Sequence, residues 1–187
     1  YKSQLTGDDL LAVQAHVTNA VELGVAQQAV GAVRSAHVAA FNPTGNDFAR
    51  MVAITQQSES GGRETNPDGS TVTSVKGAQG AMQVMPGTNL NPGFGVKPAA
   101  DNSPAERARV GRDYLAAMLT RYNGDPMKAW AAYNAGPGAV DKAVDEADTP
   151  SEWLAGMPQE TQAYVAKNIK AFQSGGGQPP MPGAGPN

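Results

Sequence analysis

The chain has 187 residues, of which 40% are hydrophobic and 17% are charged, and this length allows one sizeable core with short appendages. The net charge of −3 and the lack of a Lys/Arg run exclude a typical nucleic-acid-binding protein, and no stretch supplies the roughly 20 apolar residues of a membrane span. Cysteine is absent, which excludes disulfides and thiolate metal sites.

Residues 1–43 are expected to form a separate helical segment. Leu10, Val13 and Val17 recur at helical spacing, and a second helix is predicted over residues 26–40. The Ala and Val content of this segment suits close packing on the main domain or on other subunits of a larger assembly. Both histidines of the chain lie here and are expected to be surface or packing residues, because a metal site usually takes three or more ligands.

A helix is predicted from Asn46, a favourable N-cap residue, to the glycine pair Gly61 and Gly62. Val52 and Glu59 lie on the same face of this helix, so the Glu59 carboxyl is directed toward the core or a cleft. Desolvation and the negative end of the helix dipole would both raise its pKa. Glu59 is therefore a candidate general acid, the alternative being a solvated glutamate at a helix end.

The next segment predicts the only strand structure of the chain. Residues 66–69 read Asn-Pro-Asp-Gly, a turn signature, and residues 70–75 are rich in strand-favouring side chains, so we expect a small β-hairpin. Glu64, Asp68 and Asp101 are expected to be solvated charges of polar loops. Glu59 is thus the one acid in a position suited to catalysis.

The remaining sequence predicts four helices and a tail. Ser-Pro-Ala-Glu at residues 103–106 is a capping box with Pro at the first helical position, and Asp-Pro at residues 125–126 starts the next helix. The tail is too rich in Gly and Pro to form a core and is expected to be a flexible linker. The predicted ranges are 103–122, 125–134, 139–146 and 159–172 for the helices and 174–187 for the tail.

Four segments, in this order, resemble the soluble lytic transglycosylase (SLT) domain, whose fold is like that of goose-type lysozyme. They are Glu59-Ser60, the GAMQVMP segment at residues 80–86, the AAYNAGPG segment at residues 131–138, and the closing-helix sequence from Met157 to Val165. The resemblance implies a mainly α (α+β, lysozyme-like) catalytic domain over residues 44–173. Ala81 departs from the family pattern, where Leu is more usual, and this change should affect packing more than chemistry.

The resemblance also implies a reaction. Glu59 would protonate the β-1,4 linkage between N-acetylmuramic acid and N-acetylglucosamine in peptidoglycan. As a carboxylate it would then take the proton from the C6 hydroxyl of the muramic acid, which attacks C1 and leaves a 1,6-anhydro product. The resemblance implies no cofactor and no metal, and it makes the glycan strand the binding partner.

Motif positions assign six further residues to the substrate cleft: Ser60, Met82, Gln83, Tyr133, Asn134 and Tyr164. The resemblance places the hydroxyl groups of both tyrosines near the catalytic acid and gives Asn134 a role in sugar binding. Met82 is expected to be part of the core and the cleft wall. For Gln83 and Ser60 two interpretations stay open, since a buried Gln can pair with backbone and a helix-end Ser can cap its own helix.

The long loop after Glu59 is similar to that of phage-associated members of the family. We therefore expect a virion-associated enzyme that degrades the cell wall locally during genome entry, with residues 1–43 contacting other virion subunits. A secreted or periplasmic bacterial enzyme is the alternative setting. Two other functions stay open: a lysozyme-type hydrolase, with Asp101 as the candidate second carboxylate, and a structural virion protein with a vestigial cleft.

Overall fold

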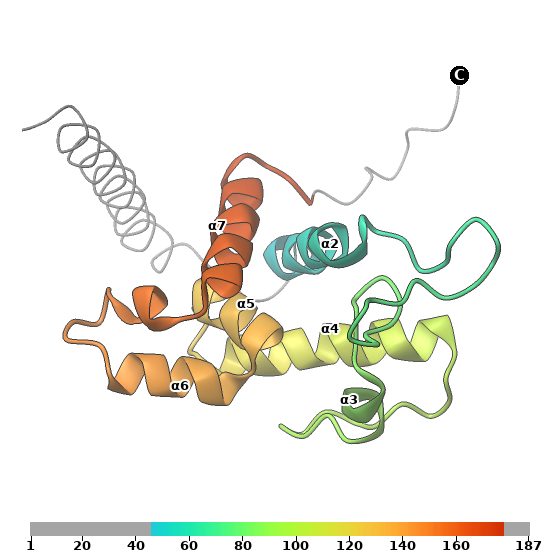
Figure 1. The fold of residues 1–187 in the computed structure, drawn as a ribbon, viewed down its shortest axis with the longest axis horizontal. Coiled ribbons are helices and arrows are strands. Elements are labelled where there is room, and N and C mark those ends of the chain that lie inside the picture. The colour runs from blue at the N-terminus through green and yellow to red at the C-terminus, as the bar shows by residue number, and fades with distance from the viewer. Residues whose placement is uncertain (1–45, 178–187) are drawn as a thin grey trace, which may run out of the picture. The chain divides into compact units, whose positions relative to one another are not determined.

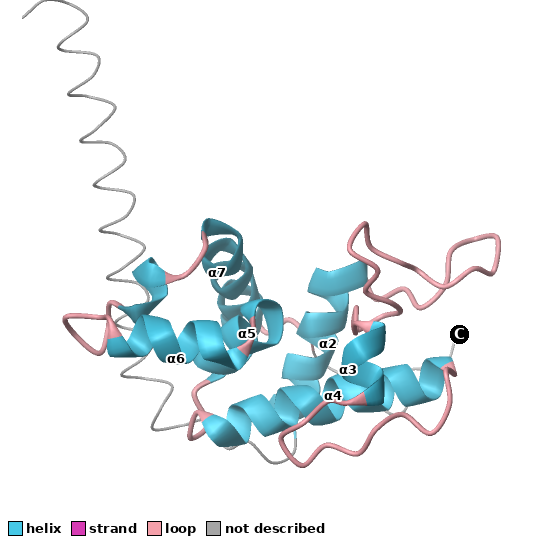
Figure 2. Cartoon of the chain, turned by 60° about the horizontal axis from the view of Figure 1, so that its bottom comes forward, coloured by secondary structure: helices cyan, strands magenta, loops and turns pink. Residues whose placement is uncertain are grey.

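The computed structural model describes residues 46–177, which belong to one compact unit. The helices predicted within residues 1–43 and the predicted tail beyond residue 177 lie outside the described residues. Helices make up the regular structure of the described part (Figure 2), so the prediction of a mainly α fold is confirmed. No helix between residues 46 and 177 is both long enough and apolar enough to cross a membrane.

In chain order the elements are α2 (Asn46–Ser60), α3 (Pro86–Leu90), α4 (Pro104–Arg121), α5 (Pro126–Ala135), α6 (Pro137–Asp145), the 3-10 helix η1 (Trp153–Gly156) and α7 (Gln159–Gln173). Helix α5 packs against α4, α6 and α7, and α2 packs against α7 and α4 (Figure 1). The five-residue helix α3 was not predicted, and α6 begins two residues before the predicted start.

The core is built where α2, α5 and α7 meet. Trp130 of α5 is fully buried, and its indole Nε1 donates a hydrogen bond of 3.0 Å to the Thr55 hydroxyl of α2. The Trp130 ring also meets the Phe172 ring of α7 edge-on, with 6.2 Å between centroids. A buried indole N–H usually requires such a partner. These contacts fix α2 on α5 and α7 one helical turn before Glu59.

Helices α4 and α5 begin near their predicted positions because their caps form. The Ser103 hydroxyl accepts from the Glu106 amide at 3.3 Å, and the Asp125 carboxylate accepts from two first-turn amides at 3.0 and 3.2 Å. The capping box is only half formed. The Glu106 carboxylate accepts instead from the Ala100 amide at 2.7 Å, and the Ser103 amide donates to Asp101 at 2.8 Å.

The predicted hairpin is less regular than a pair of strands. Its turn is present, since the Gly69 amide donates to the Asn66 carbonyl at 3.0 Å with a φ of 82° at Gly69. The flanking residues make only isolated antiparallel bridges, which join Thr65 to Thr71, Thr73 to Gln79, and Gln79 to Val84. The last bridge brings the loop back to the GAMQ segment.

Arg107 of α4 fixes these loops to the helices. Its side chain is 4% exposed, and its Nη2 donates to Glu64 Oε1 at 2.6 Å, while Glu64 Oε2 accepts from the Ala81 amide at 2.7 Å. The expectation that Glu64 is a solvated loop charge is therefore wrong, because a buried arginine far along the chain pairs with it. Asp68 and Asp101 are exposed, as expected.

Candidate active site

Glu59 lies in the last turn of α2 and is half-buried. Its Oε1 accepts a hydrogen bond of 2.7 Å from the hydroxyl of Tyr164, which lies on α7. The two residues are 105 positions apart in the chain and meet because α2 packs directly on α7. The structure thus brings together two of the residues that the sequence assigned to the site.

The pKa of Glu59 is raised above its ordinary value. Burial is the largest cause, because a low-dielectric environment disfavours the carboxylate. The Tyr164 hydrogen bond and the positive charge of Lys167 act in the opposite direction, and the negative charge of Glu160 adds to the effect of burial. The net result is a carboxyl that keeps its proton to higher pH than a solvated glutamate.

Replacing Tyr164 by Phe is expected to raise the pKa of Glu59 further. The lost hydroxyl stabilises only the charged carboxylate, so removing it favours the protonated form. NMR titration of the Glu59 carboxyl carbon measures this shift. Tyr122→Phe serves as the control, since Tyr122 donates to Asp141 instead, and it should leave the Glu59 pKa unchanged. An unchanged or lowered Glu59 pKa in the Tyr164 variant would contradict this account.

A second polar contact joins α2 to α7 beside this pair. The hydroxyl of Ser58 donates to Oδ1 of Asn168, which is fully buried and lies one helical turn after Tyr164. This contact is a second bond between α2 and α7, one helical turn along α7 from the Tyr164 bond to Glu59. Sequence reasoning missed it, although the spacing of four between Tyr164 and Asn168 places both side chains on one helix face.

Ser60 and Met82 support the site from within the core. The Ser60 hydroxyl is bonded to the Ala81 carbonyl at 3.0 Å, which joins the end of α2 to the GAMQ segment. Met82 is 1% exposed and packs with Val84 and Val110. Both side chains are buried, so Met82 takes its expected place in the core, and a sugar contact of either residue stays a prediction.

Tyr133, at the end of α5, is also held by the GAMQ segment. Its hydroxyl donates to the Met82 carbonyl at 2.8 Å, and its pKa is raised well above the ordinary value, first by burial and then by the negative charge of Glu59. The tyrosine therefore lies within the electrostatic range of the acid, while its proton is engaged by backbone. This packing requires a glycine at position 111 of α4, where an added Cβ would lie 2.7 Å from Met82 Cβ and 3.0 Å from the Tyr133 hydroxyl.

Gly111→Ala is expected to destabilise the fold by about 1–3 kcal/mol, as for other overpacked cores. The added methyl group must displace Met82 or Tyr133, because both approach closer than an ordinary van der Waals contact. Urea unfolding measures the loss. Gly138→Ala is the matched control, since an added Cβ there meets nothing within 4 Å, and it should be neutral or slightly stabilising. Equal stability of the two variants would contradict the packing argument.

The side chain of Gln83 pairs with backbone, which is one of the two interpretations that the sequence left open. Its side-chain nitrogen donates to the carbonyls of Gly80 at 2.7 Å and Val72 at 3.3 Å, and its own backbone has a positive φ of 47°. Such a backbone conformation is uncommon outside glycine and is often found where function demands it. Gln83 also lines an open hollow of about 220 Å³ together with Met85 and Tyr133, so one edge of the residue faces this hollow.

Asn134 fixes the end of α5 to the start of α7. Its Oδ1 accepts a hydrogen bond of 2.8 Å from the buried hydroxyl of Thr161, three residues before Tyr164. This contact positions the closing helix relative to the AYN segment. Between residues 46 and 177 no group of three or more His, Cys, Asp or Glu side chains is arranged to hold a metal ion.

The chain is similar in sequence to known proteins over this region. The model of the transglycosylase SLT domain family matches residues 41–155, which leaves Tyr164 and Asn168 beyond the matched range. The soluble lytic murein transglycosylases of Escherichia coli strain K12 and of strain O157:H7 are each 31% identical over 114 residues. The match covers 55% of this chain and 17% of each relative, so the chain spans about a sixth of their length.

Solved structures show the same relationship. An inactive mutant of the lytic transglycosylase Slt from Pseudomonas aeruginosa has a TM-score of 0.53 at 29% identity, covering 66% of this chain and 20% of that one. The 70 kDa soluble lytic transglycosylase of Escherichia coli has a TM-score of 0.52 at 25% identity, covering 84% of this chain and 28% of that one. Because the family model matches more than half of its 187 residues, the chain belongs to the transglycosylase SLT domain family.

Proposed function

We propose that this chain is a peptidoglycan lytic transglycosylase that cleaves the β-1,4 bond between N-acetylmuramic acid and N-acetylglucosamine. The observation that carries the proposal is the half-buried Glu59 carboxyl, whose pKa is raised by burial and which accepts a hydrogen bond from Tyr164. Membership of the SLT family and the names of the two curated relatives support the same activity. The Pseudomonas aeruginosa structure, an inactive variant in which a glutamate is replaced by glutamine, is consistent with a glutamate-based mechanism.

The proposed mechanism uses one residue as acid and then as base. Protonated Glu59 gives its proton to the glycosidic oxygen as the bond from that oxygen to C1 of the muramic acid breaks, which leaves a centre with oxocarbenium character. The Glu59 carboxylate then takes the proton of the C6 hydroxyl while the C6 oxygen bonds to C1. Glu59 is restored to its protonated form, and the strand ends in a 1,6-anhydro sugar without consumption of water.

The environment of Glu59 suits both steps. Burial raises its pKa, which favours the protonated form that the first step requires, and the Tyr164 hydroxyl stabilises the carboxylate that forms after this step. The bond to Tyr164 also holds the carboxyl in one orientation. A purely structural role would leave a costly buried acid without a purpose, because burying a charge is unfavourable unless it is compensated.

Mass spectrometry of the sugars released from purified peptidoglycan tests the proposal. A lytic transglycosylase releases anhydro-muramic products, which are lighter by one water than the reducing sugars that a lysozyme releases. The hydrolase alternative needs a second group to activate water. Its candidate, Asp101, is exposed and accepts a hydrogen bond from the amide of Ser103, the residue before α4. Hydrogen bonding to Ser103 lowers the pKa of the Asp101 carboxyl. Reducing-end products would overturn the proposal, and no release at all would favour a vestigial cleft.

We also propose that the enzyme is virion-associated and opens the cell wall locally for phage genome entry. The support is the resemblance of the long segment between Glu59 and Gly80 to phage-associated members, and the predicted helical segment of residues 1–43, which would contact other virion subunits. Immunodetection in purified phage particles tests this setting. Detection only in the periplasm or culture medium of uninfected cells would instead indicate a bacterial enzyme.

A further inference from the structure

A row of aromatic rings leads away from the catalytic acid. Tyr133, whose pKa is raised in part by the charge of Glu59, meets Tyr114 of α4 edge-on with 5.9 Å between centroids. Tyr114 in turn meets Phe94 edge-on at 6.0 Å. The three rings come from α5, α4 and the loop between α3 and α4. They form a continuous aromatic row from Tyr133 to Phe94. Tyr133 and Ser60, the residue after Glu59, donate to the adjacent carbonyls of Met82 and Ala81, which places the first ring beside the end of α2.

The first part of this row borders an open hollow. Tyr133 and Tyr114 both line the hollow of about 220 Å³, together with Gln83 and Met85 of the GAMQ segment and Gly136 at the start of α6. Concave sites with aromatic walls and a few polar groups are the usual form of small-ligand sites. Phe94 does not line this hollow, but its ring contacts Tyr114, which forms part of the wall.

Phe94 is displayed on the surface at a conformational cost. It is 49% exposed and has a φ of 51°, between Gly93 and Gly95, which also have positive φ. A bulky side chain rarely adopts this backbone conformation, and exposure of an aromatic ring gains little from the hydrophobic effect. Both features make Phe94 a candidate for contact with a ligand.

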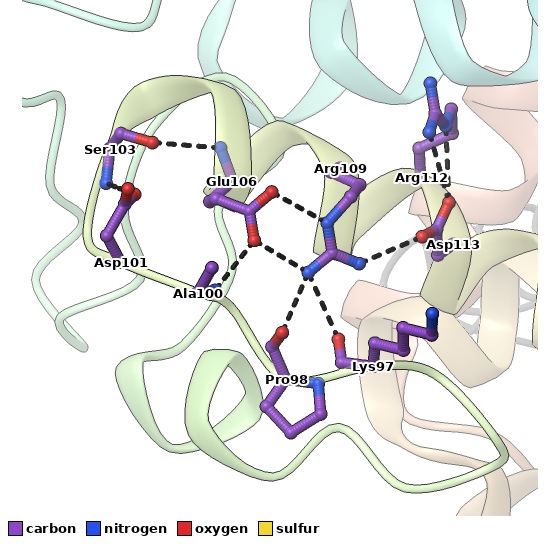
Figure 3. Close-up of polar contacts among 9 residues, drawn as sticks. All are labelled: Lys97, Pro98, Ala100, Asp101, Ser103, Glu106, Arg109, Arg112 and Asp113. Carbon is purple, nitrogen blue, oxygen red and sulfur yellow. Dashed lines mark hydrogen bonds and ion pairs between the residues drawn. The ribbon is translucent and has the colours of Figure 1, made fainter.

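The loop that carries Phe94 is fixed to α4. Arg109 donates to the carbonyl oxygens of Lys97 and Pro98 at 3.3 and 2.9 Å, and Glu106, which is bonded to Arg109, accepts from the Ala100 amide (Figure 3). These bonds hold the loop against α4. The Phe94 ring is therefore presented on a restrained loop, which lowers the entropic cost of binding.

Polar groups stand beside the outer end of the row. The guanidinium carbon of Arg121 lies 5.7 Å from the centroid of the Phe94 ring. Arg121 also pairs with Asp141 of α6 at 2.6 Å, and both side chains are about two-fifths exposed. Aromatic rings offer an apolar surface to the C–H faces of a sugar, while planar charged groups offer hydrogen bonds to its hydroxyl and acetamido groups.

We propose that Phe94 and Tyr114, with the Arg121–Asp141 pair, form a distal subsite that binds a sugar of the glycan strand beyond those held next to Glu59. The proposal rests on the proposed function, because the occupant is another part of the same substrate strand. The subsite increases affinity for long strands over short oligomers.

Isothermal titration of the non-cleaving Glu59→Gln chain with peptide-free oligomers of alternating N-acetylglucosamine and N-acetylmuramic acid tests the subsite. In this background Phe94→Ala should weaken binding of an octasaccharide by about tenfold, a change typical of an aromatic contact residue, and should change binding of a disaccharide little. Phe94→Tyr, which keeps the ring, should retain most of the affinity. Leu90→Ala, at a 74% exposed position without a ring, is the control and should bind as the parent does.

Arg121→Gln is a second probe, because it leaves the Phe94 loop and its anchors unchanged. It should also weaken octasaccharide binding selectively. Octasaccharide binding that is unchanged in both the Phe94→Ala and Arg121→Gln variants would overturn the subsite. This test is independent of the test of the proposed function. Binding that depends on Phe94 supports the subsite even if the wild-type chain releases no anhydro sugar. Release of anhydro sugars without dependence of binding on Phe94 would support the reaction and refute the subsite.

Discussion

Glu59→Gln is expected to abolish release of anhydro sugars from purified peptidoglycan, with a loss of about 10²–10⁴-fold or more, the range that general acid–base catalysis contributes. The amide keeps the shape of the side chain and can still accept from Tyr164, but it has no proton of suitable pKa to give to the glycosidic oxygen. The rate of product release, followed by liquid chromatography and mass spectrometry, measures the effect.

Two controls accompany this variant. Asp101→Asn removes an exposed carboxylate and should retain near wild-type activity, whereas the hydrolase alternative requires a large loss.

Glu59→Gln should also be at least as stable as the wild type at neutral pH. A folded-state pKa raised above the unfolded value makes the carboxylate a stability cost, which appears as pH rises through the unfolded pKa and is absent at lower pH. Near wild-type activity of Glu59→Gln would place the catalytic acid elsewhere.

Arg107→Met is expected to lower the free energy of unfolding by about 3 kcal/mol, the low end of the range for breaking a buried ion pair. The arginine side chain is 4% exposed and the Glu64 side chain 24% exposed, so the variant leaves a poorly solvated carboxylate without its partner. The destabilisation should also reach the candidate active site, because the Glu64 carboxylate accepts from the Ala81 amide of the GAMQ segment. Urea unfolding measures the stability change.

The double variant Arg107→Met, Glu64→Gln provides the comparison. It removes the uncompensated charge while the amide can still accept from Ala81, so it should recover part of the lost stability. Arg112→Met, on the same helix but 54% exposed, should change stability by less than about 0.5 kcal/mol. A double variant as unstable as the single one, or no loss in the single variant, would contradict the role assigned to this ion pair.

The sequence allowed α2, α4, α5, α6 and α7 and the position of Glu59 to be predicted, because local signals determine both, whereas the short helix α3 was not predicted. Caps at Ser103 and Asp125 and the glycine pair after Ser60 mark helix ends through bonds to near neighbours. The spacing of Glu59 from Val52 then places the carboxyl on the packed face of α2. The raised pKa that follows from this position agrees with the expectation from burial.

Other features of the site depend on contacts between distant residues, and local patterns do not reveal them. Glu64 pairs with Arg107, 43 positions away, and Ser58 bonds to Asn168, 110 positions away. Glu, Arg, Ser and Asn are usually exposed, so residue type alone predicts solvated side chains at these positions. The same limitation applies to the bond from the Ser60 hydroxyl to the carbonyl of Ala81, 21 positions away.

The source of the oxygen on C1 of the product tests the central claim most directly. Digestion of purified peptidoglycan by the wild-type chain in ¹⁸O-labelled water separates attack by the muramic acid's own C6 hydroxyl from attack by solvent. If Glu59 acts as acid and then as base on that hydroxyl, the released sugars are anhydro-muramic and carry no label. Reducing sugars labelled at C1 would contradict the account and establish a hydrolase.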